Sequence, residues 1–155
     1  MSVNLTDVEV VAAGELASWG RRLAGLMIDS LVLATIVTVT VLVAGVSLDE
    51  MNDRIRNGDS LLVLLLVVVP EAIYTTALIG SRNQTFGKMA VRIKVVDAES
   101  RSPIGYRRAF TRWFSTAFLW AMFWIPGIVD HLWPLRDDRN QTFHDKFARS
   151  LVVRT

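Results

Sequence analysis

Two long apolar segments dominate the first half of the chain. Residues 30–48 are 19 positions without a charge, and the apolar character extends back to residue 23, interrupted only by Asp29. Residues 61–79 are a second apolar segment of 19 positions, interrupted only by Glu71. A helix rises about 1.5 Å per residue, so about 20 residues match the ~30 Å hydrocarbon core of a bilayer. The pattern predicts transmembrane helices at about residues 23–46 and 61–79. A cleaved signal peptide is disfavoured for the first segment, because an acidic leader precedes it and a second span follows.

A third apolar segment, at about residues 109–135, is rich in tryptophan and phenylalanine and contains Pro126-Gly127. Tryptophan concentrates at the membrane–water interface, and proline kinks or breaks a helix. Residues 112–125, directly before the proline, are about 14 residues, or roughly 21 Å of helix, which is short for a full crossing. Two interpretations stay open, a bent or re-entrant hairpin and a plain third span. The predicted fold class is an all-α integral membrane protein with two clear spans, this third segment and short cytoplasmic β-strands.

The charges lie almost entirely between the apolar segments, and their signs differ from one connection to the next. Residues 47–60 hold four acids and two arginines, whereas residues 80–112 hold eight basic residues and two acids. Because cytoplasmic loops carry the excess of lysine and arginine, we expect residues 80–112 and the N-terminus inside the cell. We therefore predict a cytoplasmic leader at residues 1–20 and a single membrane domain at residues 21–155.

A short repeat relates the two halves of the chain. The pentapeptide Arg-Asn-Gln-Thr-Phe occupies residues 82–86 and again residues 139–143. After each copy comes a segment rich in β-branched residues, which predicts short strands at residues 91–97 and 150–154. We interpret the chain as two tandem units, each with a membrane hairpin, this turn and a strand. Parallel repeats place equivalent parts on one side, so the C-terminus is expected in the cytoplasm.

Two acids inside the predicted spans are the main candidates for chemistry. A charge within the bilayer costs at least a few kcal/mol, so Asp29 and Glu71 are candidate functional groups. They fall at similar depth in an antiparallel hairpin, and as a pair they could bind a cation or relay protons. The alternative is a structural network in which they pair with Arg22 or Lys88. The chain has no cysteine and two histidines, so we expect no metal, no cofactor and no enzymatic activity.

Three ordered signatures resemble the RDD family of mostly bacterial membrane proteins. They lie at residues 19–29, at residues 85–89 with 95–97, and at residues 142–146 with 151–153. The resemblance places the arginine and two aspartates that name the family on Arg22, Asp29 and Asp145. It implies a multi-pass protein of the bacterial cytoplasmic (inner) membrane, and transport, including sodium–proton exchange, has been suggested for members. If the tail is cytoplasmic, Asp145 is expected to meet Arg22 at the membrane surface.

Two functions therefore remain as hypotheses. The first is a small transporter or transporter component for a cation, a proton or a small ligand. The second is a non-catalytic accessory subunit or assembly factor of a larger membrane complex. The expected partners are the lipid bilayer and either further copies of the chain or a larger complex, without nucleic acid. The candidate ligand or ion residues are Arg22, Asp29, Glu71 and Asp145, with Lys88, Asp130 and His144 as supporting polar groups.

Overall fold

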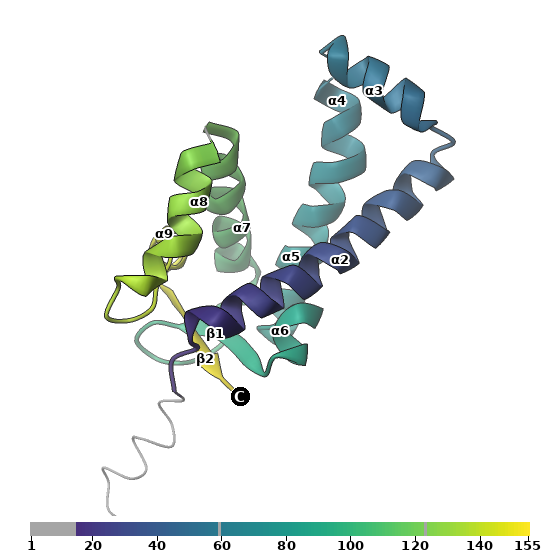
Figure 1. Ribbon diagram of the computed structural model, residues 1–155. Coiled ribbons are helices and arrows are strands. Elements are labelled where there is room, and N and C mark those ends of the chain that lie inside the picture. The colour runs from purple at the N-terminus through teal and green to yellow at the C-terminus, as the bar shows by residue number, and fades with distance from the viewer. Residues whose placement is uncertain (1–14, 59, 123) are drawn as a thin grey trace, which may run out of the picture.

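The computed structural model describes residues 15–58, 60–122 and 124–155. Helices form most of this part of the chain, and two short strands pair with each other (Figure 1). The elements are, in order, α2 (Trp19–Val43), α3 (Leu48–Arg56), α4 (Ser60–Val63), the π-helical turn η1 (Leu64–Val68), α5 (Val69–Arg82), α6 (Phe86–Ala90), β1 (Ile93–Asp97), α7 (Gly105–Met122), α8 (Trp124–Leu132), the 3-10 turn η2 (Trp133–Leu135), α9 (Phe143–Phe147) and β2 (Ser150–Arg154).

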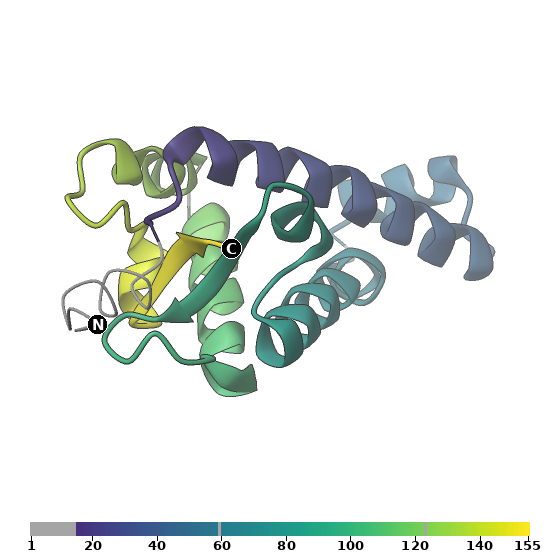
Figure 2. The same ribbon diagram turned by 90° about the horizontal axis from the view of Figure 1, so that it is seen from below.

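Two helical hairpins rise from the same side of the paired strands (Figure 1). The first hairpin consists of α2 and the segment from α4 to α5, connected by α3, and the second consists of α7 and α8. Figure 2 looks from the strand side: β1 and β2 lie in front of α7, with α2 and α5 beside them. The strands and the short helices α6 and α9 thus form a base beneath both hairpins.

The first hairpin supplies two helices that are long and apolar enough to cross a membrane, Trp19–Val43 and Leu64–Arg82. Their large apolar side chains are exposed, among them Leu31 at 71% and Leu42 at 70%. A water-soluble fold rarely leaves a continuous apolar surface of this kind uncovered, whereas lipid covers it without cost. The span predicted at 23–46 corresponds to α2, which begins earlier, at Trp19. It also ends earlier, at Val43, because Gly45 adopts a left-handed conformation (φ 69°) that terminates the helix.

The connection between the spans is itself helical. In α3 the Ser47 side chain accepts a hydrogen bond from the Glu50 amide at 3.1 Å, which caps the start of the helix. Met51 packs with Val41 and Leu66, so α3 closes the far end of the first hairpin. A serine followed three residues later by glutamate is the sequence signal for such a cap.

The second hairpin turns earlier than the sequence suggested. Helix α7 ends at Met122 and α8 begins at Trp124, so the break does not lie at Pro126-Gly127 as expected. Pro126 instead lies in the first turn of α8, where a missing amide donor costs no helical hydrogen bond. Gly127 lies against the Trp120 ring, and a Cβ there would meet the indole at 2.5 Å. The glycine thus lets the two helices of the hairpin pack closely.

The base is built from two copies of one local structure, at a constant shift of 57 residues (from 82 to 139). Helices α6 and α9 each have five residues, as do β1 and β2. Each copy has a left-handed asparagine before its helix and a left-handed arginine after it. In the first copy the Gln84 amide donates to the Ile93 carbonyl at 2.8 Å, and in the second Gln141 donates to the Ser150 carbonyl at 2.9 Å. The internal repeat predicted from the pentapeptide is therefore present in the fold.

The two strands pair antiparallel, with Val95 opposite Val152. These two residues are themselves equivalent in the repeat, so a local pseudo-twofold axis passes between them. The strands lie within the segments predicted at 91–97 and 150–154. Val95 and Val152 join Ala17, Ile79 and Ala109 in the main buried core, which ties the strands to α5 and α7.

Most of the leader predicted at residues 1–20 falls outside the described residues. Its described end runs along β2, where the Ala17 amide donates to the Val152 carbonyl at 2.9 Å and Leu16 forms a bridge with Val153. Helix α2 then begins at Trp19, so the last two leader residues are already helical.

Candidate functional site

A cavity of about 360 Å³ lies between the two hairpins and the base. Helices α2, α5, α7 and α8 each turn one face toward the cavity. The lining residues on that face recur at helical intervals along the sequence. Along α7, for example, Trp113, Thr116 and Trp120 line it, and along α5 Glu71, Tyr74 and Thr75 do so. Most of the lining is aliphatic or aromatic, and ionised side chains concentrate toward the base. All the polar contacts described next border this cavity or lie directly beneath it.

Asp29 is 5% exposed and is held by α5 and α6. Its carboxylate accepts hydrogen bonds from the Tyr74 hydroxyl at 2.6 Å, the Thr85 hydroxyl at 2.5 Å and the Gly87 amide at 2.8 Å. The Lys88 ammonium lies 3.7 Å from the same carboxylate. A buried carboxylate with three donors and a nearby cation is fully satisfied, so Asp29 fastens α2 to α5 and α6.

Two glycines let the backbones approach closely enough for this. Gly25 on α2 lies against Gly87 on α6, and a Cβ on Gly87 would sit 2.1 Å from the Gly25 carbonyl oxygen. Any side chain at residue 87 would push α6 away from α2. The Gly87 amide would then lose its hydrogen bond to Asp29.

Asp145 is fully buried between two arginines. The Arg22 guanidinium binds it at 2.6 Å between Nη1 and Oδ2, and Arg112 binds its other oxygen, Oδ1. Asp145 also caps its own helix: its amide donates to the Thr142 hydroxyl at 3.1 Å, and its carboxylate accepts from the Thr142 amide at 3.2 Å. Burial alone would raise the pKa of Asp145, but Arg112 and then Arg22 hold it far below the usual carboxyl range. The contact predicted between Arg22 and Asp145 is confirmed, and Arg112 completes it as a triad.

Asp130 and His144 form a second buried pair beside this triad. Asp130 accepts hydrogen bonds from the His144 amide at 3.1 Å and contacts the His144 ring at 2.6 Å. The His131 ring lies 3.6 Å from the same carboxylate. Burial lowers the pKa of His144, although Asp130 acts in the opposite direction. His144 is the counterpart of Gly87 in the repeat, and both amides donate to an aspartate of a neighbouring helix.

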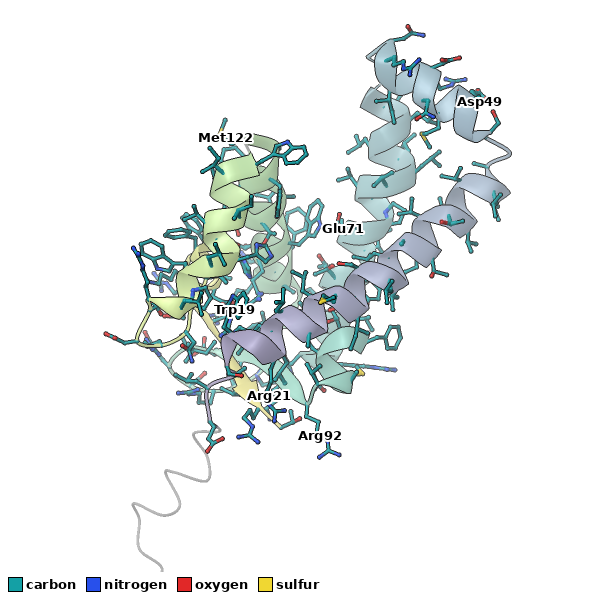
Figure 3. The ribbon with its side chains drawn as sticks, viewed as in Figure 1. Trp19, Arg21, Asp49, Glu71, Arg92 and Met122 are labelled. Carbon is teal, nitrogen blue, oxygen red and sulfur yellow. The ribbon has the colours of Figure 1, made fainter. Side chains whose placement is uncertain are left out.

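Glu71 differs from the other acids around the cavity. Its side chain is half-buried on the side of α5 that is turned toward the second hairpin (Figure 3). Within the described part of the chain, no hydrogen bond or ion pair reaches its carboxylate. The pairing of Asp29 with Glu71 considered above is not what the structure has, because Tyr74, Thr85 and Gly87 already occupy the Asp29 oxygens. Both acids nevertheless line the same cavity.

Two buried donors on residues that line the cavity lack an acceptor among the described residues. They are Nη2 of Arg22 and the indole nitrogen of Trp113. Trp19, by contrast, donates to the His131 carbonyl at 2.9 Å and so joins the start of α2 to the end of α8 (Figure 3). No group of three or more His, Cys, Asp or Glu side chains suited to a metal occurs in residues 15–58, 60–122 and 124–155.

The family model of the RDD family matches residues 16–149, which is most of the chain. The chain belongs to the RDD family. No curated protein and no solved structure matches it. The RDD match and the two apolar helices together make this a membrane domain. Arg22, Asp29 and Asp145, on which the resemblance places the arginine and two aspartates of the family, are each bonded to another element in this fold.

Sequence reasoning missed several residues that complete this RDD site. Arg112 was counted only as a basic flanking residue, and Tyr74 carries no charge that would mark it within an apolar segment. Helical spacing could have indicated Tyr74, because it follows Glu71 by one turn and shares its face. Among the supporting residues, Lys88 accompanies Asp29, whereas Asp130 and His144 pair with each other.

Proposed function

We propose that this RDD membrane protein is a small transporter, or a transporter component, that binds a cation or a proton in the cavity between its hairpins. The observation that carries the proposal is Glu71, an acid of a membrane-spanning helix that faces the cavity with its charge unpaired among the described residues. An unpaired acid at such depth is costly unless it exchanges a proton or a cation. We assign the protein no catalytic step and no cofactor.

The proposed topology places the base in the cytoplasm and both hairpins in the bilayer of a bacterial inner membrane. Support comes from the common direction of the hairpins (Figure 1) and from the arginines that flank their base ends, including Arg21, Arg82 and Arg107. At about 1.5 Å per residue, the nine residues of α8 span only roughly 14 Å, so we propose that the second hairpin is re-entrant. The N- and C-termini then lie on the same side.

The test is cation and proton flux in proteoliposomes that contain the purified full chain. We expect Glu71→Gln to abolish flux, because it removes the exchangeable charge and keeps the shape of the side chain. Glu99→Gln, in the turn after β1, is the matched control and should leave flux unchanged. Flux that is equal in the Glu71→Gln protein and the unmodified protein would refute the assignment.

A second candidate function is an accessory subunit or assembly factor, and one surface of α7 favours it. Phe110, Phe114 and Phe118 recur every four residues, are each about half exposed and stack on one another along the helix. Such an aromatic face could dock a neighbouring helix of another copy or of a larger complex. Co-purification with one dominant partner, lost on Phe114→Ala, together with an absence of flux, would favour this function.

A further inference from the structure

The walls of the cavity are unusual for an inorganic ion. Between the base and Glu71 they present indole rings and aliphatic side chains, including Trp113, Trp120, Leu26 and Ile128. The oxygens of Asp29 are occupied by three donors, and Thr116 donates to the Arg112 carbonyl at 3.0 Å. A hard metal cation that gives up its water needs about six oxygen ligands. The described residues of this cavity offer one unoccupied carboxylate instead.

The charges around the cavity nevertheless call for a cation. Asp145 is bonded to Arg22 and Arg112, and Asp29 lies beside Lys88. Asp130, beneath the cavity, contacts the rings of His131 and His144. Glu71 also lines the cavity, and no described cation pairs with its carboxylate, so a positively charged ligand would pair with it there.

An organic cation with apolar substituents meets both conditions. Its charge pairs with Glu71, and it brings its own apolar surface, so the walls do not need to replace a hydration shell. Trp113 and Trp120 line the cavity, and tryptophan is the aromatic side chain whose π-electrons attract a cation most strongly. A volume of about 360 Å³ falls at the lower end of the range for pockets that hold drug-sized molecules.

We propose that the ligand of this cavity is a lipophilic organic cation, held between the Glu71 carboxylate and the indole rings of α7. The inference rests on the proposed function, because it names the class of cation that Glu71 binds. Helices α2 and α5, which we place in the membrane, form part of the cavity wall. Such a ligand can therefore reach the cavity from the lipid phase.

The test compares tetraphenylphosphonium with tetraphenylborate, an anion of nearly the same size and shape. Binding of each radiolabelled ion to the full chain in non-ionic detergent is measured in separate samples by equilibrium dialysis. We expect saturable binding of the phosphonium, weakened about tenfold or more by Glu71→Gln, which is the loss of one charged contact. Glu71→Asp, which keeps the charge, should retain part of the affinity, and Glu99→Gln should retain all of it.

A second pair of variants tests the aromatic wall. Trp120→Leu should weaken phosphonium binding about threefold or more, the size of one cation–π contact. Phe118→Leu on the exposed side of α7 should not change binding. If Trp120→Leu elutes as aggregate, Trp113→Leu replaces it, and the same threefold criterion applies.

Several outcomes would overturn the inference. Phosphonium binding that does not saturate, or that is equal in Glu71→Gln, would refute it. Saturable binding of the borate instead would show that the unpaired Arg22 nitrogen recognises an anion. Glu71-dependent flux of sodium or protons without phosphonium binding would refute the ligand class and leave the proposed function standing. Saturable, Glu71-dependent phosphonium binding without any flux would support the ligand class and refute the proposed transport function.

Discussion

The triad of Arg22, Asp145 and Arg112 offers the sharpest test of how the base is held together. Asp145→Asn keeps the shape of the side chain and removes the charge between two buried arginines. Removal of one partner of a buried ion pair costs about 3–5 kcal/mol, because an uncompensated charge remains. Arg22→Gln alone should cost less, about 1–3 kcal/mol, since Arg112 still neutralises Asp145.

The double variant with Asp145→Asn and Arg22→Gln gives the decisive result, because the effect of Arg22→Gln on stability should lose or reverse its sign there. In the Asp145→Asn background, Arg22 is an unpaired cation beside Arg112, so Arg22→Gln should become neutral or stabilising. The coupling energy between the two sites should reach about 2 kcal/mol. The apparent free energy of unfolding is measured by titrating SDS into maltoside micelles and following circular dichroism.

The control is Arg154→Gln, which removes the exposed pair with Glu15 and should cost under about 1 kcal/mol. Equal destabilisation by Arg22→Gln in both backgrounds would refute the triad. A direct exchange of charge between Arg22 and Asp145 is a poorer test, because the exchanged arginine would face Arg112.

Two further predictions follow from the base. Gly87→Ala should abolish the monodisperse peak of the protein in detergent size-exclusion chromatography, because its Cβ would overlap the Gly25 carbonyl, whereas Gly20→Ala, with nothing within 4 Å, should not. Acidification from about pH 7.5 to 5 should lower the unfolding temperature: burial lowers the pKa of His144 in the folded state, so the unfolded chain binds more protons below about pH 6.5. His144→Asn should reduce this loss, and Asp145 does not contribute in that window because its depressed pKa keeps its stabilisation until far lower pH. An unchanged pH profile in His144→Asn would contradict the assignment.

Sequence predicted the parts of this fold that depend on local pattern. The two apolar helices follow from hydropathy alone, and the repeated base follows from the pentapeptide at 82–86 and 139–143. The position of the break between α7 and α8 could not be predicted from local pattern. A proline is tolerated in the first turn of a helix and breaks a helix only in its interior. Local pattern does not distinguish the two cases at Pro126.

The partners of the buried charges were harder to predict. Arg22 and Asp145 are 123 residues apart, and only the family signatures together with the expected topology brought them together. The roles of Asp29 and Glu71 could not be separated by sequence, since both are single acids in apolar helices. They differ through Tyr74, Thr85 and Gly87, which converge on Asp29 only in the folded chain.

The antiparallel pairing of β1 and β2 about Val95 and Val152 has a consequence for how such a protein can vary. Two separate identical subunits, joined in the same way, would carry the same residue at both copies of every position. Here one polypeptide contains both copies, and the position that is Lys88 in the first is Asp145 in the second. These two groups lie close enough to influence each other, with Asp145 favouring the charged form of Lys88. A duplicated and fused gene could thus acquire opposite charges across its own axis, which a symmetric pair of identical chains cannot do.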